Sequence, residues 1–198
     1  MHMPSPNTVA PAQGLYQPDE FKDNCGFGLI AHMQGDASHD LVKTAIHSLS
    51  CMTHRGGIAA DGKTGDGCGL LLAMPKAFFR EEAKKLSDIT LSEIFAVGTI
   101  FLNLDPAIAA HSKQILTKEI ESEGLKVLAW RLIPTNVEAL GEIALQSMPA
   151  FEQIIVNCPM GVTEVEFNRK LFLARRRAEQ LLVNDSSFYV TTLCSTVI

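Results

Sequence analysis

The sequence predicts an α+β fold in which layered sheets carry helices on their outer sides. Apolar runs with strand character recur along the chain, and amphipathic helical patterns separate some of them. The two kinds of element do not alternate strictly, which argues against a doubly wound parallel sheet. A hydrophobic content of 46% over 198 residues suits one domain with a real core, or part of a larger one.

The first elements are a leader, a strand and a helix. Residues 1–24 hold four of the nine prolines and show no periodicity, so they are expected to be a disordered leader, neither a secretory signal nor a transit peptide. A strand is expected over 25–33. Ser38 can then cap a helix that stops at Gly56-Gly57, with apolar positions at Leu41, Val42, Ala45, Ile46, Leu49 and Met52.

The later elements follow a glycine-dense loop over residues 53–69, where special backbone angles are needed. Local signals set their limits: Pro75 and Asp105-Pro106 open helices, Gly124 ends one, and Thr163 with Glu166 forms a capping box. The expected strands are 68–74, 94–104, 125–133, 151–157 and 188–198, and the expected helices are 75–85, 105–124, 137–146 and 163–183.

Charge and cysteine usage exclude several classes of protein. The net charge is −5 and the dense basic run Arg175-Arg176-Arg177 sits in a helical pattern, so nucleic acid is not an expected partner. The five cysteines are odd in number and form no Cys-x-x-Cys pair, which argues against a disulfide framework and a thiolate metal site and favours a reducing compartment. No apolar run approaches the ~18 residues of a membrane helix.

One motif predicts a competing function. Residues Gly57 to Thr64 fit the phosphate-binding pattern Gly-x-x-x-x-Gly-Lys-Thr, which would make the chain a nucleotide-binding module. That loop works between a buried strand and a helix. Here a helix is expected before it, and the glycine-rich run 65–69 follows it, where no helix would nucleate. The nucleotide hypothesis is kept as the alternative.

Cys25 is the candidate reactive residue, with glycines at 26 and 28 that let a ligand approach the sulfur. Its local sequence also fits a buried structural cysteine, and a Cys–His dyad stays open because such pairs meet only in the fold. Arg55 is likewise open between a side chain of the site and a solvent-exposed arginine at a helix end.

Taken together, the motifs resemble the start of the large subunit of bacterial glutamate synthases, whose first domain is a class II glutamine amidotransferase. The resemblance runs from about residue 14 to residue 198. It is carried by Asp23-Asn24-Cys25-Gly26-Phe27-Gly28, His54-Arg55-Gly56-Gly57, Ala60 to Gly69, Pro134-Thr135-Asn136, Gly141-Glu142-Ile143-Ala144, Arg175-Arg176-Arg177 and Phe188-Tyr189-Val190. It implies an N-terminal-nucleophile hydrolase fold, an αββα sandwich of antiparallel sheets, of which residues 25–198 would be the incomplete first part.

The resemblance also implies a catalytic role for Cys25. Cleavage between Asn24 and Cys25 would remove the leader, so that the thiolate attacks the glutamine side-chain amide and the freed α-amino group acts as base. The resemblance places Gly26, Arg55 and Gly56 along the wall of the substrate site. It places the arginine that holds the glutamine carboxylate, and the Asn-Gly oxyanion hole, in segments that these 198 residues lack. The chain alone is therefore expected to be inactive. Besides the glutaminase and the nucleotide-binding hypotheses, a third hypothesis is that the chain is an inert structural fragment.

For the full-length enzyme, the resemblance implies that ammonia freed from glutamine passes to 2-oxoglutarate to form glutamate. No cofactor and no metal is expected in this chain. FMN and a 3Fe-4S cluster would be carried by the remainder of the same polypeptide, and a small reductase-type subunit would be the partner. A cytoplasmic enzyme is expected.

Overall fold

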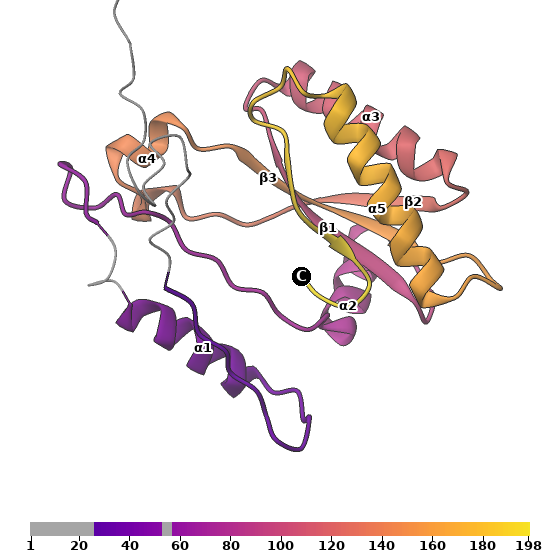
Figure 1. The fold of residues 1–198 in the computed structure, drawn as a ribbon, viewed down its shortest axis with the longest axis horizontal. Helices are drawn as coiled ribbons and strands as arrows, with labels where there is room; N and C mark the ends of the chain where they lie inside the picture. Colours follow the sequence, from indigo (N-terminus) through magenta and orange to yellow (C-terminus); the bar gives the residue numbers. More distant parts are fainter. Residues whose placement is uncertain (1–25, 53–56) are drawn as a thin grey trace, which may run out of the picture. The chain divides into compact units, whose positions relative to one another are not determined.

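The computed structural model describes residues 26–52 and 57–198. The chain divides into two units, Met1–Gly57 and Ile58–Ile198. Figure 1 labels the helices and strands of both. The expected leader, with Asn24, and the nucleophile Cys25 lie outside the described residues.

The first unit contains one helix, α1 (His39–Cys51), among its described residues. As expected, the Ser38 hydroxyl caps it by accepting the Leu41 backbone N–H at 3.2 Å. The helix ends at Cys51 with Met52 as its C-cap, before the predicted stop at Gly56-Gly57. The predicted strand 25–33 is wrong for its described part, because residues 26–33 adopt irregular structure.

The second unit is built on one antiparallel sheet of four strands. These are β1 (Phe95–Leu102), β2 (Lys126–Leu132), β3 (Ala150–Asn157) and β4 (Tyr189–Cys194), in the order β2-β3-β1-β4. The antiparallel pairing confirms the α+β class predicted from the sequence. No second sheet occurs among residues 26–52 and 57–198.

Two helices cover one face of this sheet, α3 (Pro106–Ser122) and α5 (Glu164–Leu181) (Figure 1). Both begin where the sequence predicts. The Asp105 carboxylate accepts the N–H groups of the first turn of α3, and the Thr163 hydroxyl accepts the Glu166 N–H of α5. Gly124, with φ of 76°, follows the end of α3. These local caps fix the directions in which the helices leave the sheet.

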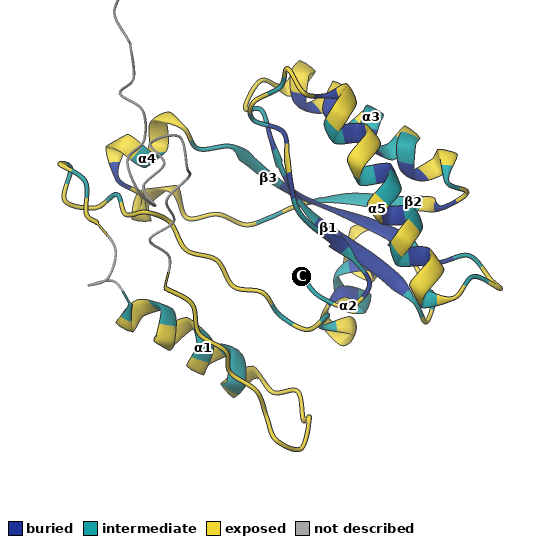
Figure 2. Ribbon diagram, in the orientation of Figure 1, coloured by how far each residue is buried: buried dark blue, intermediate teal, exposed yellow. Residues whose placement is uncertain are grey.

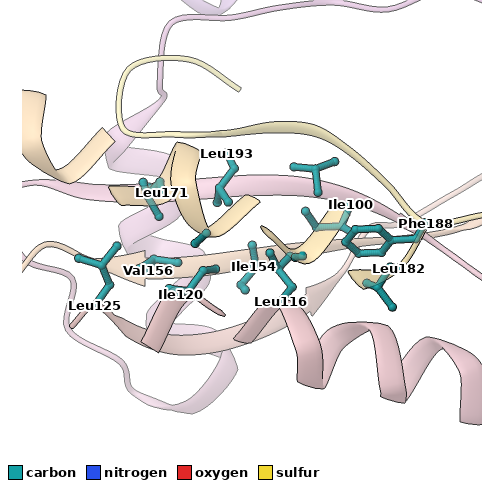
Figure 3. Close-up of a cluster of buried hydrophobic side chains, with 14 of the residues drawn as sticks. Ile100, Leu116, Ile120, Leu125, Ile154, Val156, Leu171, Leu182, Phe188 and Leu193 are labelled. Atoms are coloured by element: carbon teal, nitrogen blue, oxygen red, sulfur yellow. The ribbon is translucent and has the colours of Figure 1, made fainter. Parts of the chain in front are cut away.

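The main core lies between these helices and the sheet. Even-numbered residues of β1 and β3 point to it, since side chains alternate along a strand, and the central strands are almost entirely buried (Figure 2). Its side chains interdigitate as Figure 3 shows, and include Ile100, Leu116, Ile120, Ile154, Val156, Leu171 and Leu193.

The opposite face of the sheet is covered in part by α2 (Lys76–Ser87). Phe79 and Ala83 of this helix pack on the odd-numbered residues Phe95, Val97 and Ile155. Beside them, the Arg131 guanidinium of β2 donates to Glu82 of α2 at 2.7 Å and to Gln153 of β3 at 3.0 Å. Hydrogen bonds from Lys85 and Arg131 lower the pKa of Glu82. An ion pair thus joins α2 to the sheet at the edge of its apolar contact.

In the second unit, three further predicted elements differ from the structure. Residues 68–74 form no regular strand; Ala73 makes an isolated antiparallel bridge with Val197, and backbone hydrogen bonds on either side of it join Leu72 to Ile198 and Met74 to Thr196. The last strand ends at Cys194 rather than at Ile198. The predicted helix 137–146 is split into a 3₁₀ turn, Val137–Ala139, and α4 (Glu142–Gln146), because Leu140 and Gly141 between them are extended.

Candidate functional site

The sequence-predicted site is mostly beyond the described residues. Asn24, Cys25, Arg55 and Gly56 all lie outside them, so the assembly of the predicted site stays a prediction. Gly26 is described, and it is exposed in an irregular stretch. What the structure does describe is the glycine-rich segment that follows Arg55-Gly56 in the chain.

That segment forms a tight hairpin, defined here as residues 58–65. Ile58 and Gly65 make an antiparallel bridge, and the Ala59 N–H donates to the Thr64 carbonyl at 2.8 Å. The Gly62 N–H donates back to the Ala59 carbonyl at 3.0 Å, with Gly62 at φ of 70°, in the region that favours glycine. The predicted loop is therefore a closed turn with a fixed backbone.

Asp61 organises the interior of the hairpin. Its Oδ1 accepts the backbone N–H groups of Lys63 at 3.0 Å and Thr64 at 2.8 Å. Its Oδ2 accepts the Thr64 hydroxyl at 2.5 Å. The hydroxyl and these amide donors hold the pKa of the Asp61 carboxyl well below its ordinary value, so Asp61 is a carboxylate throughout the neutral range.

The hairpin also holds the start of α4, which lies about 80 residues further along the chain. Asp61 Oδ2 accepts the Ile143 N–H at 3.1 Å, and the Thr64 hydroxyl oxygen accepts the Ala144 N–H at 3.2 Å. Gly141, the N-cap of α4, has no side chain to make these bonds itself. A Cβ at Gly141 would clash with Asp61 Oδ2, Thr64 Oγ1 and the Thr64 nitrogen, so only glycine fits this approach.

The hairpin geometry overturns the nucleotide-binding alternative. The backbone N–H groups of Lys63 and Thr64 are bonded to Asp61 and do not face a ligand. No helix follows Thr64; the next one, α2, begins at Lys76. A phosphate loop needs free backbone amides at the start of a helix. Residues Gly57 to Thr64 therefore match the motif by chance and lack its structural context.

One described thiol lies beside a histidine: Cys51 Sγ is 3.7 Å from His47 Nε2, both exposed on α1, which is the kind of Cys–His pair that the sequence left open. Burial first, then the carboxylates of Glu164 and Glu166, raise the pKa of Cys158, which keeps it a neutral thiol. Cys51 and Cys68 are exposed, and Cys194 accepts the Val197 N–H at 3.4 Å. No three His, Cys, Asp or Glu side chains gather into a metal-binding group within the part of the chain that the structure describes.

An open groove of about 440 Å³ lies on the sheet face opposite α3 and α5. It carries no titratable side chain and is lined by Gly69, Leu70, Leu71, Thr99, Phe101, Thr191, Thr192 and Ile198. Beside it, Phe101 packs edge-on against Phe151 at 4.9 Å between ring centroids and lies 5.9 Å from Tyr189. The composition is that of a packing surface and not of a catalytic centre.

Sequence reasoning missed the contact between the hairpin and α4. The Asp-x-x-Thr spacing is a local signal for a turn in which the carboxylate accepts nearby amides. Its second partner, the Gly141–Ala144 turn, leaves no signal at residue 61, because the two segments are distant in the chain.

None of the helices in the described ranges has the length and apolar character needed to cross a bilayer.

Comparison with known proteins gives the family. The profile described as "Glutamine amidotransferases class-II" matches residues 25–198. The chain is 37% identical to the glutamate synthase [NADPH] large chain of Bacillus subtilis over 194 residues, which covers 97% of this chain and 13% of that protein. It is 35% identical to ferredoxin-dependent glutamate synthase 2 of Synechocystis over 184 residues, 90% of this chain and 12% of that protein.

A third relative, the glutamate synthase [NADH] of Saccharomyces cerevisiae, is 32% identical over 209 residues, which covers all of this chain and 10% of that protein. The chain thus spans only about an eighth or less of the length of these relatives. The family profile covers residues 25–198, which include every described residue, and this match identifies the family. This chain belongs to the class II glutamine amidotransferases.

Proposed function

We propose that this chain is the first part of the glutaminase domain of a glutamate synthase, which hydrolyses glutamine to glutamate and ammonia. The observation that carries the proposal is the start of the family match at residue 25, the cysteine that the sequence singles out as nucleophile. A domain that begins at its own cysteine is what cleavage between Asn24 and Cys25 would produce. The relatives are glutamate synthases by name, which supports the same assignment.

The chemistry follows from placing the thiol and the amine on one residue. The α-amine of Cys25 takes the thiol proton, and the thiolate attacks the side-chain amide carbon of glutamine. As the C–N bond breaks, the amine returns the proton to the leaving nitrogen, which departs as ammonia. Water, deprotonated by the same amine, then cleaves the thioester to release glutamate. An α-amine titrates near ~8 and a thiol near ~8.5, so the proton exchange is nearly matched.

Gly26, Arg55 and Gly56 are proposed to line the substrate site beside Cys25. While residues 1–24 remain attached, the nitrogen of Cys25 is an amide without useful basicity, so the uncleaved chain is proposed to be a proenzyme. In the full-length enzyme, the freed ammonia would react with 2-oxoglutarate, and a small reductase-type subunit would be the partner. We place the enzyme in the cytoplasm, consistent with the free thiols of the four cysteines in the described ranges.

FMN and the 3Fe-4S cluster of the full-length enzyme are proposed to lie in the remainder of the polypeptide. An iron–sulfur cluster needs several thiolates around it. Among the described residues, no three His, Cys, Asp or Glu side chains gather in this way. No step of the glutaminase reaction proposed above depends on either cofactor.

The fold proposed for the complete domain is the αββα sandwich, with the four-stranded sheet as one of its two inner layers. The support is the half-covered sheet face: α2 covers Phe95, Val97 and Ile155, while the groove beside Phe101 has no helix over it within residues 58–198. Tyr189 on this face is 56% exposed. A second sheet packed here would bury these aromatic side chains.

We expect the purified 198-residue chain to release no measurable glutamate from glutamine. It contains neither an Arg-Phe-Ser-Thr-Asn nor an Asn-Gly sequence, which the family uses for the carboxylate clamp and the oxyanion hole. Loss of even one oxyanion donor costs ~100- to 1000-fold in rate. The assay compares glutamate release by this chain and by the full-length protein. Release by the short chain would contradict the assignment of those missing parts, and no release by the full-length protein would contradict the proposed function.

A further inference from the structure

The polar face of α1 carries a histidine and a cysteine that no step of the proposed reaction uses. His47 and Cys51 are four residues apart, a spacing that makes two side chains neighbours on one face of a helix. Cys51 Sγ lies 3.7 Å from His47 Nε2. Both residues are exposed, and the Cys51 thiol is free. Two atoms that are good ligands for a zinc-like cation therefore lie side by side in solvent.

The pair lies opposite the apolar positions of α1. Each residue of an α-helix is turned by ~100° from the one before it, so positions 47 and 51 fall on the side away from the hydrophobic stripe. The half-buried residues of the helix form that stripe, and they are Leu41, Val42, Ala45 and Leu49. A neighbour that packs on the stripe leaves His47 and Cys51 in contact with solvent.

The distance within the pair fits a chelate. In a tetrahedral zinc site, the metal lies ~2.3 Å from a thiolate sulfur and ~2.0–2.1 Å from an imidazole nitrogen, which places those two ligand atoms ~3.5 Å apart. The observed 3.7 Å between Cys51 Sγ and His47 Nε2 differs little from that separation. Because both ligands stand on one helix, only small side-chain movements are needed to hold the ion.

Water would fill the other two positions of such an ion. Asp40, the acidic residue of α1, is seven residues from His47, which is ~10 Å along the helix axis. Its carboxylate pairs with Lys43 at 3.3 Å. No third His, Cys, Asp or Glu side chain completes the set within the described residues. Two protein ligands bind a metal ion more weakly than the four of a structural zinc site, so the ion would exchange with solvent.

We propose that His47 and Cys51 form a chelating site for Zn²⁺. The ion displaces the proton of the Cys51 thiol to solvent, and Sγ binds it as a thiolate while Nε2 binds it as a neutral imidazole. No atom is oxidised or reduced. The sequence predicted no thiolate metal site because it holds no Cys-x-x-Cys pair, but the helical spacing of a histidine and a cysteine is a different arrangement. The site is independent of the proposed glutaminase reaction, which uses neither side chain.

The alternative role of the pair is activation of the Cys51 thiol by His47 without a metal. A hydrogen bond between two exposed side chains contributes little in water, whereas a cation bonds to both ligand atoms at once. The exposed geometry therefore favours the metal site. An experiment that follows the reactivity of this one thiol separates the two roles.

Protection of Cys51 from alkylation tests the site in the full-length protein. Iodoacetamide labelling of the peptide that contains Cys51 is followed by mass spectrometry with ZnCl₂, with MgCl₂ and without added metal. His47→Ala removes one ligand and keeps the thiol. His39→Ala is the matched control, because His39 is also exposed on α1 but lies three turns before Cys51.

We expect excess Zn²⁺ to slow alkylation of Cys51 by ~10-fold or more in the wild type and in His39→Ala, and by less than ~2-fold in His47→Ala. MgCl₂ should protect none of the three proteins, because Mg²⁺ prefers oxygen ligands. Equal zinc protection in His47→Ala and the wild type would overturn the proposal, as would a wild type that zinc does not protect. If His47→Ala slows alkylation without metal while zinc has no effect on the wild type, His47 activates the thiol and the metal site is refuted.

Discussion

Replacing Cys25 by alanine in the full-length enzyme should lower kcat/KM for glutamine hydrolysis by at least ~1000-fold. The variant has no nucleophile, and removing a covalent nucleophile leaves only the catalysis that binding and oxyanion donors supply. Glutamate release from glutamine measures the effect. Added ammonium salt should restore glutamate formation from 2-oxoglutarate, because in the proposed scheme only the production of ammonia is lost.

The matched control for this loss is Cys51→Ser, which changes an exposed thiol on α1. It should keep glutamine-dependent activity close to that of the wild type. Burial raises the pKa of Cys158, so that thiol should also react slowly with alkylating reagents at neutral pH. Substantial glutamine hydrolysis by Cys25→Ala would remove Cys25 from the mechanism.

The largest effect on stability is expected for Gly98→Val, in the middle of the central strand β1. A Cβ at this position would lie 2.8 Å from Leu193 Cδ1, 2.9 Å from the Thr192 carbonyl oxygen and 3.0 Å from Ile154 Cγ2. The carbonyl belongs to the neighbouring strand and cannot move without breaking the β1–β4 pairing. Overpacking of this kind costs about 1–3 kcal/mol or more, and two further methyl groups place Val at the upper end.

Native-state hydrogen exchange of β3 amides in the full-length protein measures this loss, because β3 pairs with β1 along its whole length. Gly98→Ala should give a smaller loss than Gly98→Val. Gly69→Ala is the control, since a Cβ there meets no atom within 4 Å and its effect should stay within about 0.5 kcal/mol. Equal protection in the Gly98→Val protein and the wild type would show that the sheet tolerates this volume.

Features fixed by neighbouring residues were predictable from the sequence. Ser38, Asp105 and Thr163 cap the helices expected of them, because each cap involves residues only two or three positions away. The strands expected over 94–104 and 151–157 correspond to β1 and β3, because a strand in the middle of a sheet is marked by a continuous apolar run.

Features that depend on residues distant in the chain were not predictable from the sequence. Residues 26–33 have the composition of a strand, but they are irregular in the structure, and a strand also needs a hydrogen-bonded neighbour that the local sequence does not reveal. The helix expected over 137–146 breaks at Gly141 because that glycine lies against Asp61 and Thr64. The flanking elements already argued against the phosphate-loop pattern over Gly57 to Thr64, but the contacts of Asp61 with Thr64 and with the distant Ile143 could not be predicted from the sequence.

If Cys25 acts as an N-terminal nucleophile, the mature full-length enzyme must begin with it, and the N-terminal sequence of that enzyme tests this role. Mass spectrometry of the N-terminal peptide should find Cys25 as the first residue, with Asn24 and the residues before it removed. After reaction with an electrophilic glutamine analogue, the same peptide should carry the added mass. A mature enzyme that starts at any other residue, or whose label lies on another peptide, would contradict the role of Cys25 as the N-terminal nucleophile.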